Sequence, residues 1–306
     1  MKFSEIVGHR RSIEVLRRMY RRGRVPHALL FIGPEGVGKR MVAEAFFQYL
    51  NCPSAGEDSC GLCPSCEKVT KGRHPDLHLL VPEGERIKIQ QIRELAHMLY
   101  LRPLEARWRG AIIEGAERMT KEAANAFLKT LEEPPPQTLI VLITSRPEGL
   151  LPTISSRCQR IRFYPLSDEE VREVLEREGV SPGDIELLLR LAEGSPGKAL
   201  EFTAFPFEEM EGWIADALKK PGEITKLLGR AEELSSDRKR SRVATGLLLT
   251  RLRDEIVRRL DSKDQEIERF LDLFWQIREV ERAMEENVNL RMAWEKIFLE
   301  MSRCAS

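Results

Sequence analysis

The stretch GPEGVGKR, Gly33 to Arg40, predicts the fold of the first half of the chain. It matches the phosphate-binding pattern G-x-x-x-x-G-K-[ST] at Gly33, Gly38 and Lys39, but Arg40 stands where a hydroxyl would hold magnesium. Glycines are needed because successive backbone N–H groups wrap a polyphosphate, and the lysine neutralises phosphate charge. The stretch predicts a P-loop, and the alternative is a simple glycine turn between a strand and a helix.

The sequence on both sides of this loop alternates between strand-like and helix-like runs. HALLFIG (27–33) reads as a buried strand and KRMVAEAFFQYL (39–50) as the helix after the loop. GAIIEG (110–115) and TLIVLITS (138–145) read as further buried strands, separated by a helix with Thr120 as its N-cap. This alternation predicts an α/β fold in which helices cover a parallel sheet.

The residues that hydrolysis requires are altered at a second position. P-loop ATPases hold Mg²⁺ with the loop hydroxyl and an acidic residue at the end of a buried strand, and a second carboxylate commonly positions water. Here Glu114 could serve the metal, but Gly115 stands at the position of the second carboxylate. The sequence therefore predicts a nucleotide fold that has lost, or nearly lost, hydrolysis.

Four cysteines fall within fifteen residues, in CPSAGEDSCGLCPSC. Four thiolates can close a tetrahedral zinc site, and Cys-x-x-Cys steps supply two ligands from one turn. Disulfides and an iron–sulfur cluster are the alternatives, the first disfavoured because no secretory signal is recognisable. A closed site leaves no open coordination position, so we expect a structural Zn²⁺ in a module at about residues 51–72, held by Cys52, Cys60, Cys63 and Cys66.

The composition predicts a soluble cytoplasmic protein. The 306 residues are 42% hydrophobic and 32% charged, and basic and acidic residues number 49 each. The chain has no excess of positive charge that would indicate a nucleic-acid partner. It also has no apolar run long enough to predict a membrane partner. The chain is long enough for two or three domains.

The second half of the sequence has a helical texture. Short helices are expected from Asp168 to about Phe202, and helices alone from about Pro206. One run has apolar residues at helical spacing, which predicts a core face within a bundle, with a partner groove as the alternative. Its members are Ile267, Phe270, Leu271, Phe274, Ile277 and Val280.

Taken together, these motifs resemble the clamp-loader branch of the AAA+ ATPases over nearly the whole chain. FSEIVGHRRSIEVL (3–16) resembles its opening segment, and the four-cysteine insertion after the P-loop helix is typical of its bacterial members. The most specific match is AANAFLKTLEEPPPQTLIVLITSRPEGLLPTISSRCQRIRF (123–163). The resemblance implies a P-loop AAA+ domain at 1–165, a small helical lid domain at 166–204 and an all-α collar domain for oligomerisation at 205–306.

The resemblance also implies roles for single residues. Arg157, in the motif Ser-Arg-Cys, matches the arginine that projects into the ATP site of a neighbouring subunit, and Thr144 matches the sensor position. Gly197 replaces the arginine of the lid motif G-S-x-R, which is similar to an ATPase-inactive member of the branch. A degenerate site for ATP or ADP would comprise Gly33, Gly36, Gly38, Lys39, Arg40, Glu114 and Thr144.

The implied partners are those of a loader. They are the ATPase subunits and the δ subunit in a hetero-pentameric ring, with the sliding clamp contacted indirectly and primer-template DNA through the complex. On its own the chain is expected to show no enzymatic activity. The alternatives are an ATP-hydrolysing subunit of the same loader and a zinc-containing nucleic-acid-binding module; the basic run RRSIEVLRRMYRRGR (10–24) favours the second.

Overall fold

A computed structural model of the chain describes residues 1–205, 210, 212, 214, 224–262, 267–285 and 288–304. It divides into two compact units: Met1–Glu178 with Gly194–Gly197, and Gly179–Glu193 with Lys198–Ser306. The expected domain boundaries at 165 and 204 stay predictions, and residues 206–209, just beyond the second, lie outside the described residues.

The first unit is built on a five-stranded parallel sheet with the strand order β2-β3-β4-β1-β5. The strand that precedes the P-loop lies between the two strands that end at Thr144 and Arg162, and its last residue, Ile32, pairs with both. The predicted parallel sheet is confirmed. The strands are β1 (Ala28–Ile32), β2 (Leu77–Leu80), β3 (Arg109–Ile113), β4 (Thr138–Thr144) and β5 (Gln159–Arg162).

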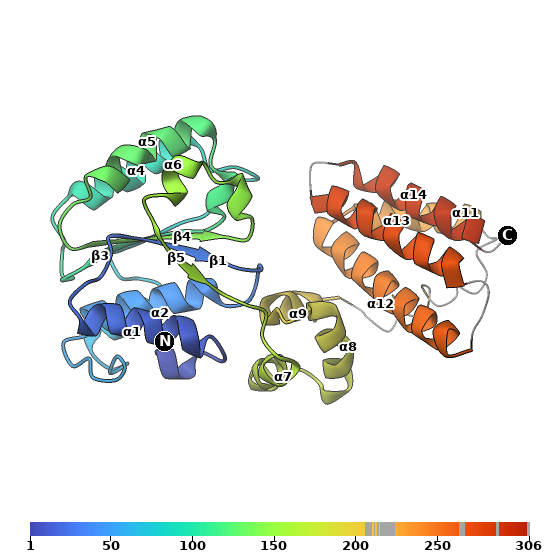
Figure 1. The fold of residues 1–306 in the computed structure, drawn as a ribbon, viewed down its shortest axis with the longest axis horizontal. Helices are drawn as coiled ribbons and strands as arrows, with labels where there is room; N and C mark the ends of the chain where they lie inside the picture. The colour runs from blue at the N-terminus through green and yellow to red at the C-terminus, as the bar shows by residue number, and fades with distance from the viewer. Residues whose placement is uncertain are drawn as a thin grey trace. The chain divides into compact units, whose positions relative to one another are not determined.

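Helices cover both faces of this sheet (Figure 1). Helices α1 and α2 lie on one face, and α4, α5 and α6 lie on the other. The predicted N-cap of α5 is present, because the Thr120 hydroxyl accepts a hydrogen bond from the N–H of Ala123 at 3.2 Å. The bounds are α1 (Arg10–Arg21), α2 (Lys39–Asn51), α3 (Pro64–Thr70), α4 (Ile89–Tyr100), α5 (Lys121–Glu132), α6 (Pro152–Ser155) and α7 (Asp168–Arg177), with 3₁₀ turns η1 (Phe3–Glu5), η2 (Ala116–Arg118) and η3 (Pro147–Gly149).

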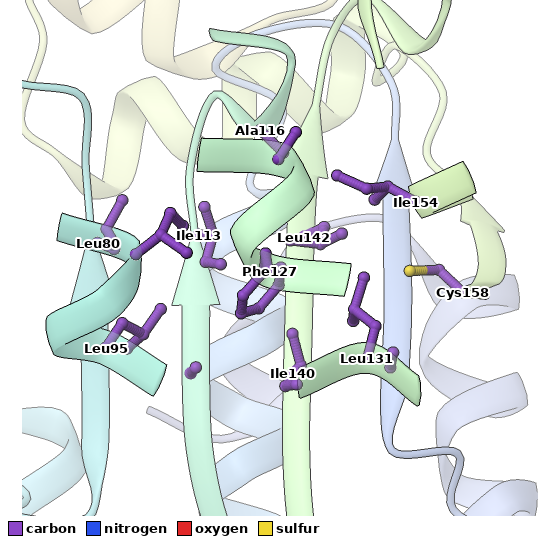
Figure 2. Close-up of a cluster of buried hydrophobic side chains, with 14 of the residues drawn as sticks. Leu80, Leu95, Ile113, Ala116, Phe127, Leu131, Ile140, Leu142, Ile154 and Cys158 are labelled. Carbon is purple, nitrogen blue, oxygen red and sulfur yellow. The ribbon is translucent and has the colours of Figure 1, made fainter. Parts of the chain in front are cut away.

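A hydrophobic cluster joins the α4–α5–α6 side of the sheet to the strands beneath it (Figure 2). Phe127 of α5 is fully buried against the sheet residues Ile113 and Ile140. Leu131, at the end of α5, and Cys158, after α6, belong to the same cluster. Burial on this scale stabilises each large side chain by about 1.5–3 kcal/mol, so the ends of α5 and α6 are held firmly on the sheet.

The described part of the second unit consists mainly of helices. Among its described residues Trp294 is the largest fully buried side chain, and its indole N–H donates to the Ser241 hydroxyl at 3.1 Å. Described helices are α8 (Pro182–Ala192), α11 (Ile224–Ser235), α12 (Arg238–Ser262), α13 (Ile267–Glu285) and α14 (Leu290–Cys304), while α9 (Pro196–Phe202) crosses the boundary between units. Within the part of the chain that the structure describes, no helix is long and apolar enough to span a membrane.

The core face predicted for α13 is only partly correct. Ile277 and Val280 are buried as expected, together with Leu273, which the prediction did not include. Leu271 is instead exposed. The buried face of α13 is therefore rotated around the helix and shorter than the apolar pattern suggests. An apolar pattern that covers a wide part of the helix surface does not specify which part packs against the neighbouring helices.

Candidate functional site

The P-loop connects the end of β1 to the start of α2, as predicted. Gly36 and Gly38 have φ angles of 75° and 101°, in the left-handed region that favours glycine. At Gly33 a Cβ atom would lie 2.4 Å from the Phe163 carbonyl oxygen. Two of the glycines are therefore required by backbone conformation and the third by close packing of β1 against the segment after β5.

Every carbonyl group from Gly33 to Gly38 accepts a hydrogen bond within the chain. The N–H and C=O of a trans peptide point in opposite directions, so fixing the carbonyls also fixes where the loop N–H groups point. The loop thus keeps a defined shape through its own contacts. The donors, in order along the loop, are Lys39 Nζ to Gly33 and to Pro34, Ser195 Oγ to Glu35, Gly197 N to Gly36, His9 Nε2 to Val37 and Val42 N to Gly38.

The side chain of Lys39 turns back onto this loop. Its Nζ lies 2.6 Å from the Gly33 oxygen and 2.5 Å from the Pro34 oxygen, and the residue is only 6% exposed. Burial lowers the pKa of Lys39 to about 8, and the nearby carboxylates of Glu117, Glu35 and Glu114 oppose that change. Lys39 therefore supports the loop directly in this conformation.

Arg40 follows Lys39 at the position where the P-loop pattern has a hydroxyl residue, and its guanidinium contacts two carboxylates. Its Nε lies 2.8 Å from Glu44 Oε1, and its Nη1 lies 3.6 Å from Glu114 Oε2. Burial raises the pKa of Glu114, and Arg40 acts in the opposite direction. The carboxylate predicted to serve the metal is thus paired with a guanidinium of the same chain.

The segment after β3 contains an acidic residue that sequence reasoning missed. Gly115 is in the left-handed conformation, with φ of 60°, and Glu117 follows in η2. Glu117 Oε1 accepts from the Ser145 hydroxyl at 3.1 Å, while Oε2 is buried and has no hydrogen-bond partner among the described residues. The signal was present, since Glu117 closes the same stretch AIIEGAE that contains Glu114.

Thr144 ends β4 next to the P-loop, and its role as a sensor stays a prediction. It is 1% exposed, and its carbonyl accepts from the N–H of Gly33 at 3.2 Å. Its hydroxyl accepts from the N–H of Arg146 at 3.1 Å. The structure therefore places Thr144 beside the first glycine of the loop.

The lid motif packs directly on the P-loop. Ser195 Oγ donates to the Glu35 oxygen at 2.7 Å, and the N–H of Gly197 donates to the Gly36 oxygen at 2.9 Å. A Cβ atom at Gly197 would lie 2.8 Å from Gly36 Cα. This contact is too short for any side chain, so the backbone approach requires glycine where the lid motif of active subunits has arginine.

The four predicted zinc ligands come together. The Sγ atoms of Cys52, Cys60, Cys63 and Cys66 all lie within 4.8 Å of one another, and those of Cys60 and Cys66 are 3.9 Å apart. A tetrahedral Zn²⁺ with Zn–S bonds of about 2.3 Å would separate its sulfurs by about 3.8 Å. The four thiols therefore fit a zinc ion after small adjustments.

The polar surroundings of the cysteines also suit a metal site. The N–H of Cys60 donates to Cys52 Sγ at 3.2 Å, and the N–H of Cys63 donates to Cys60 Sγ at 3.3 Å. Hydrogen bonds from the backbone N–H groups of Leu62 and Cys63 lower the pKa of Cys60 to about 6. Burial raises the pKa of Cys66. The fifth described free thiol, Cys158, is part of the hydrophobic cluster and lies outside this group.

Arg157 lies on the surface just after α6. Its Nη2 is 2.6 Å from Glu132 Oε1, and its Nη1 is 2.9 Å from the Thr153 oxygen. The side chains of Arg157 and Glu132 are 37% and 50% exposed. Sequence reasoning named Arg157 but missed Glu132, because the two are 25 positions apart and no short-range pattern links them.

Comparison with known proteins places the chain in a family. Residues 8–167, just over half of the chain, match the family model described as DNA polymerase III, delta subunit. The chain therefore belongs to that family. Its relatives include the DNA polymerase III subunit delta' of Bacillus subtilis (strain 168), 39% identical over 185 residues, and that of Escherichia coli (strain K12), 38% identical over 198 residues.

The chain matches only part of these relatives. The two alignments cover 59% and 62% of this chain and 55% and 58% of the relatives, so the chain spans little more than half of their length. The subunit tau of E. coli (strain K12) is 34% identical over 220 residues, 70% of this chain and 34% of tau. These names confirm the resemblance to clamp-loader subunits and agree with the δ′ type that Arg40, Gly115 and Gly197 indicate.

A solved structure supports the fold. A gamma subunit-related protein of DNA polymerase III from Thermotoga maritima aligns with 96% of this chain and 100% of its own. The TM-score is 0.54 at 24% sequence identity. This likeness confirms the predicted α/β P-loop fold followed by helices.

Proposed function

We propose that this chain is the δ′ subunit of a DNA polymerase III clamp loader, an ATPase-inactive or nearly inactive member that helps to load the sliding clamp onto DNA. The observation that carries this proposal is the guanidinium of Arg40 between Glu44 and Glu114. A positive charge at this place repels a divalent cation, and Glu114 already has a partner. Mg²⁺-dependent hydrolysis therefore lacks its metal site.

Two further features act in the same direction. Gly115 provides no carboxylate to position water, and Gly197 provides no guanidinium to contact a phosphate. Restoring an arginine at Gly197 would require the lid segment to move away from Gly36, because even a Cβ atom does not fit there. A single substitution in this chain is therefore not expected to restore ATP hydrolysis.

The loop retains the features needed to bind a nucleotide without hydrolysing it. Backbone N–H groups at the start of α2 would hold the phosphates of ATP or ADP, and Lys39 would turn from the loop carbonyls to the phosphate. Thr144 lies beside Gly33 and would complete the site. Such a nucleotide would stabilise the arrangement of the loop.

The zinc module would have a structural role. Cys52, Cys60, Cys63 and Cys66 would hold one Zn²⁺, which supplies cross-linking energy to a segment that has few buried apolar side chains. The four protein ligands leave no position for substrate. The metal would therefore fix the fold of residues 51–72.

The activity of the subunit would be expressed through its neighbours. Arg157 would reach the ATP site of an adjacent subunit, within a hetero-pentameric ring that contains the ATPase subunits and δ. The clamp would be contacted indirectly and primer-template DNA through the whole complex, while the helical second unit would take part in assembly. The cytoplasmic location and the absence of a membrane partner stay predictions.

The experiment that tests this proposal combines assembly and hydrolysis. The chain should co-purify in a stable complex with the other loader subunits, and clamp loading by the reconstituted complex should require it. A monomeric chain that hydrolyses ATP would instead support the ATP-hydrolysing alternative. Tight DNA binding by the isolated chain, with a steep salt dependence, would support the nucleic-acid-binding alternative.

A further inference from the structure

The ion pair of Arg157 and Glu132 is formed by residues that each adjoin, in sequence, a buried residue of one hydrophobic cluster. Glu132 follows Leu131, which is 1% exposed, and Arg157 precedes Cys158, which is 8% exposed. Figure 2 shows Leu131 and Cys158 in that cluster. Because these neighbours are fixed by packing, the two charged side chains are presented to each other by rigid backbone.

The position of Glu132 is unfavourable for its own helix. Glu132 is the last residue of α5, where the carbonyl ends of the helix concentrate partial negative charge and disfavour a carboxylate. The guanidinium of Arg157, 2.6 Å away, compensates for that charge. The favourable contact of the Glu132 carboxylate is therefore the one with Arg157, and the charge interaction with the end of α5 is unfavourable.

Both terminal nitrogens of Arg157 are engaged within the chain. Nη2 donates to Glu132 and Nη1 donates to the Thr153 carbonyl at 2.9 Å, with the Ser156 hydroxyl 3.5 Å from Nη1. A carboxylate in contact with the guanidinium neutralises the charge that an incoming phosphate would meet. Glu132 and a γ-phosphate therefore compete for the same cation.

From this geometry we infer that Glu132 is a positioning residue that holds Arg157 in a withdrawn state until the nucleotide of a neighbouring subunit displaces it. This inference rests on the proposed trans-acting role of Arg157. The side chains are 37% and 50% exposed, so the pair is screened by water and weak enough for a phosphate to displace. An exposed pair of this kind shifts a binding equilibrium by about two- to fivefold.

The test measures ATP hydrolysis by the reconstituted loader at several ATP concentrations. Glu132→Gln keeps the shape of the side chain and removes its charge. It should lower the KM for ATP by about two- to fivefold and leave kcat unchanged, because the finger is already engaged when the sites are saturated. The difference from the wild-type complex should shrink as salt is raised, since exposed charges are screened. Glu133→Gln, the adjacent exposed carboxylate, is the matched control and should match the wild type.

Two further variants separate the inference from the function on which it rests. Arg157→Ala should slow hydrolysis, and Glu132→Gln added to it should have no further effect, because the two residues act as one unit. If Arg157→Ala slows hydrolysis but Glu132→Gln equals Glu133→Gln, or raises the KM, Glu132 does not withhold the finger. If Arg157→Ala itself has no effect, the trans-acting role is wrong. Thermal unfolding of each isolated chain verifies that the variants are folded.

Discussion

Arg40 and Glu114 form an ion pair across the start of α2 and the end of β3, with Arg40 Nη1 3.6 Å from Glu114 Oε2. In a P-loop ATPase the residues at these two positions serve the same magnesium ion. Here one of them carries a positive charge and contacts the other directly. A direct ion pair between two side chains of this chain thus takes the place of a contact that would be made through a metal ion.

The isolated protein should therefore hydrolyse ATP at the background rate, with or without Mg²⁺. Arg40→Thr restores the hydroxyl but not the missing groups at Gly115 and Gly197, so it should remain inactive as well. Phosphate release from purified protein is the measurement, and Lys39→Ala is the control for contaminating ATPases. Turnover that is lost in Lys39→Ala would show that the site is active.

The pH dependence of stability should reveal the buried state of Lys39. Burial lowers its pKa from 10.5 to about 8 in the folded protein. Between these pH values the unfolded chain binds more protons than the folded one, so the free energy of unfolding should rise with pH in this window. Compared with Lys39→Met, the gain between pH 8 and pH 10.5 should be about 1–3 kcal/mol by chemical denaturation. Parallel pH profiles for the two proteins would contradict the buried lysine.

Gly197→Ala should destabilise the first unit. The added Cβ would lie 2.8 Å from Gly36 Cα and 2.9 Å from its oxygen, and both are backbone atoms that cannot move aside cheaply. We expect a loss of about 1–3 kcal/mol in the free energy of unfolding, as for other overpacked positions. Gly56→Ala, in the same unit, is the control, because no heavy atom other than those of its chain neighbours lies within 4 Å of its Cβ position. Equal stability of the two variants would show that the lid segment does not pack on the loop.

Purified protein should carry one tightly bound zinc. Cys63→Ser should reduce the metal content and increase amide exchange around residues 51–72, while the sheet stays protected, because the module follows a completed strand–loop–helix unit. Cys158→Ala, which alters a thiol outside the cluster, should keep one zinc. Elemental analysis that finds iron, or no metal in freshly reduced protein, would refute the zinc site.

Arg157→Ala should leave the chain folded and able to join the complex, and it should slow ATP hydrolysis and clamp loading. A guanidinium suits the spread charge of a γ-phosphate in transfer, and arginine fingers supply roughly 10³-fold or more in other P-loop systems. A complex with several active sites should lose less overall. Arg157→Lys should recover little, because an ammonium lacks the planar fork of donors. Wild-type rates with Arg157→Ala would rule out a role in trans.

Local sequence patterns were sufficient for the central elements of the fold. The runs that predicted strands at 27–33, 110–115 and 138–145 are β1, β3 and β4, and Thr120 caps α5 as its position before the helix indicated. Continuous apolar runs and helix-start signals involve only residues close in sequence, so they can be recognised without knowing which elements pack together. The edge strands β2 and β5 were not predicted, because each has only four residues. In β5 one side chain is buried and the other three are exposed, so the strand has no apolar run.

The sequence by itself determined which chemical groups are available: a P-loop without its hydroxyl, a strand end without its second carboxylate, four clustered thiols, and Arg157 in a Ser-Arg-Cys motif. Only the tertiary structure decided what those groups contact. Ser195 reaches Glu35 across 160 positions of the chain, Arg40 pairs with Glu114, and Arg157 pairs with Glu132. Hydrogen bonds and ion pairs act over a few ångströms whatever the separation in sequence, so partners are set by how the sheet and helices pack and leave no local pattern to read.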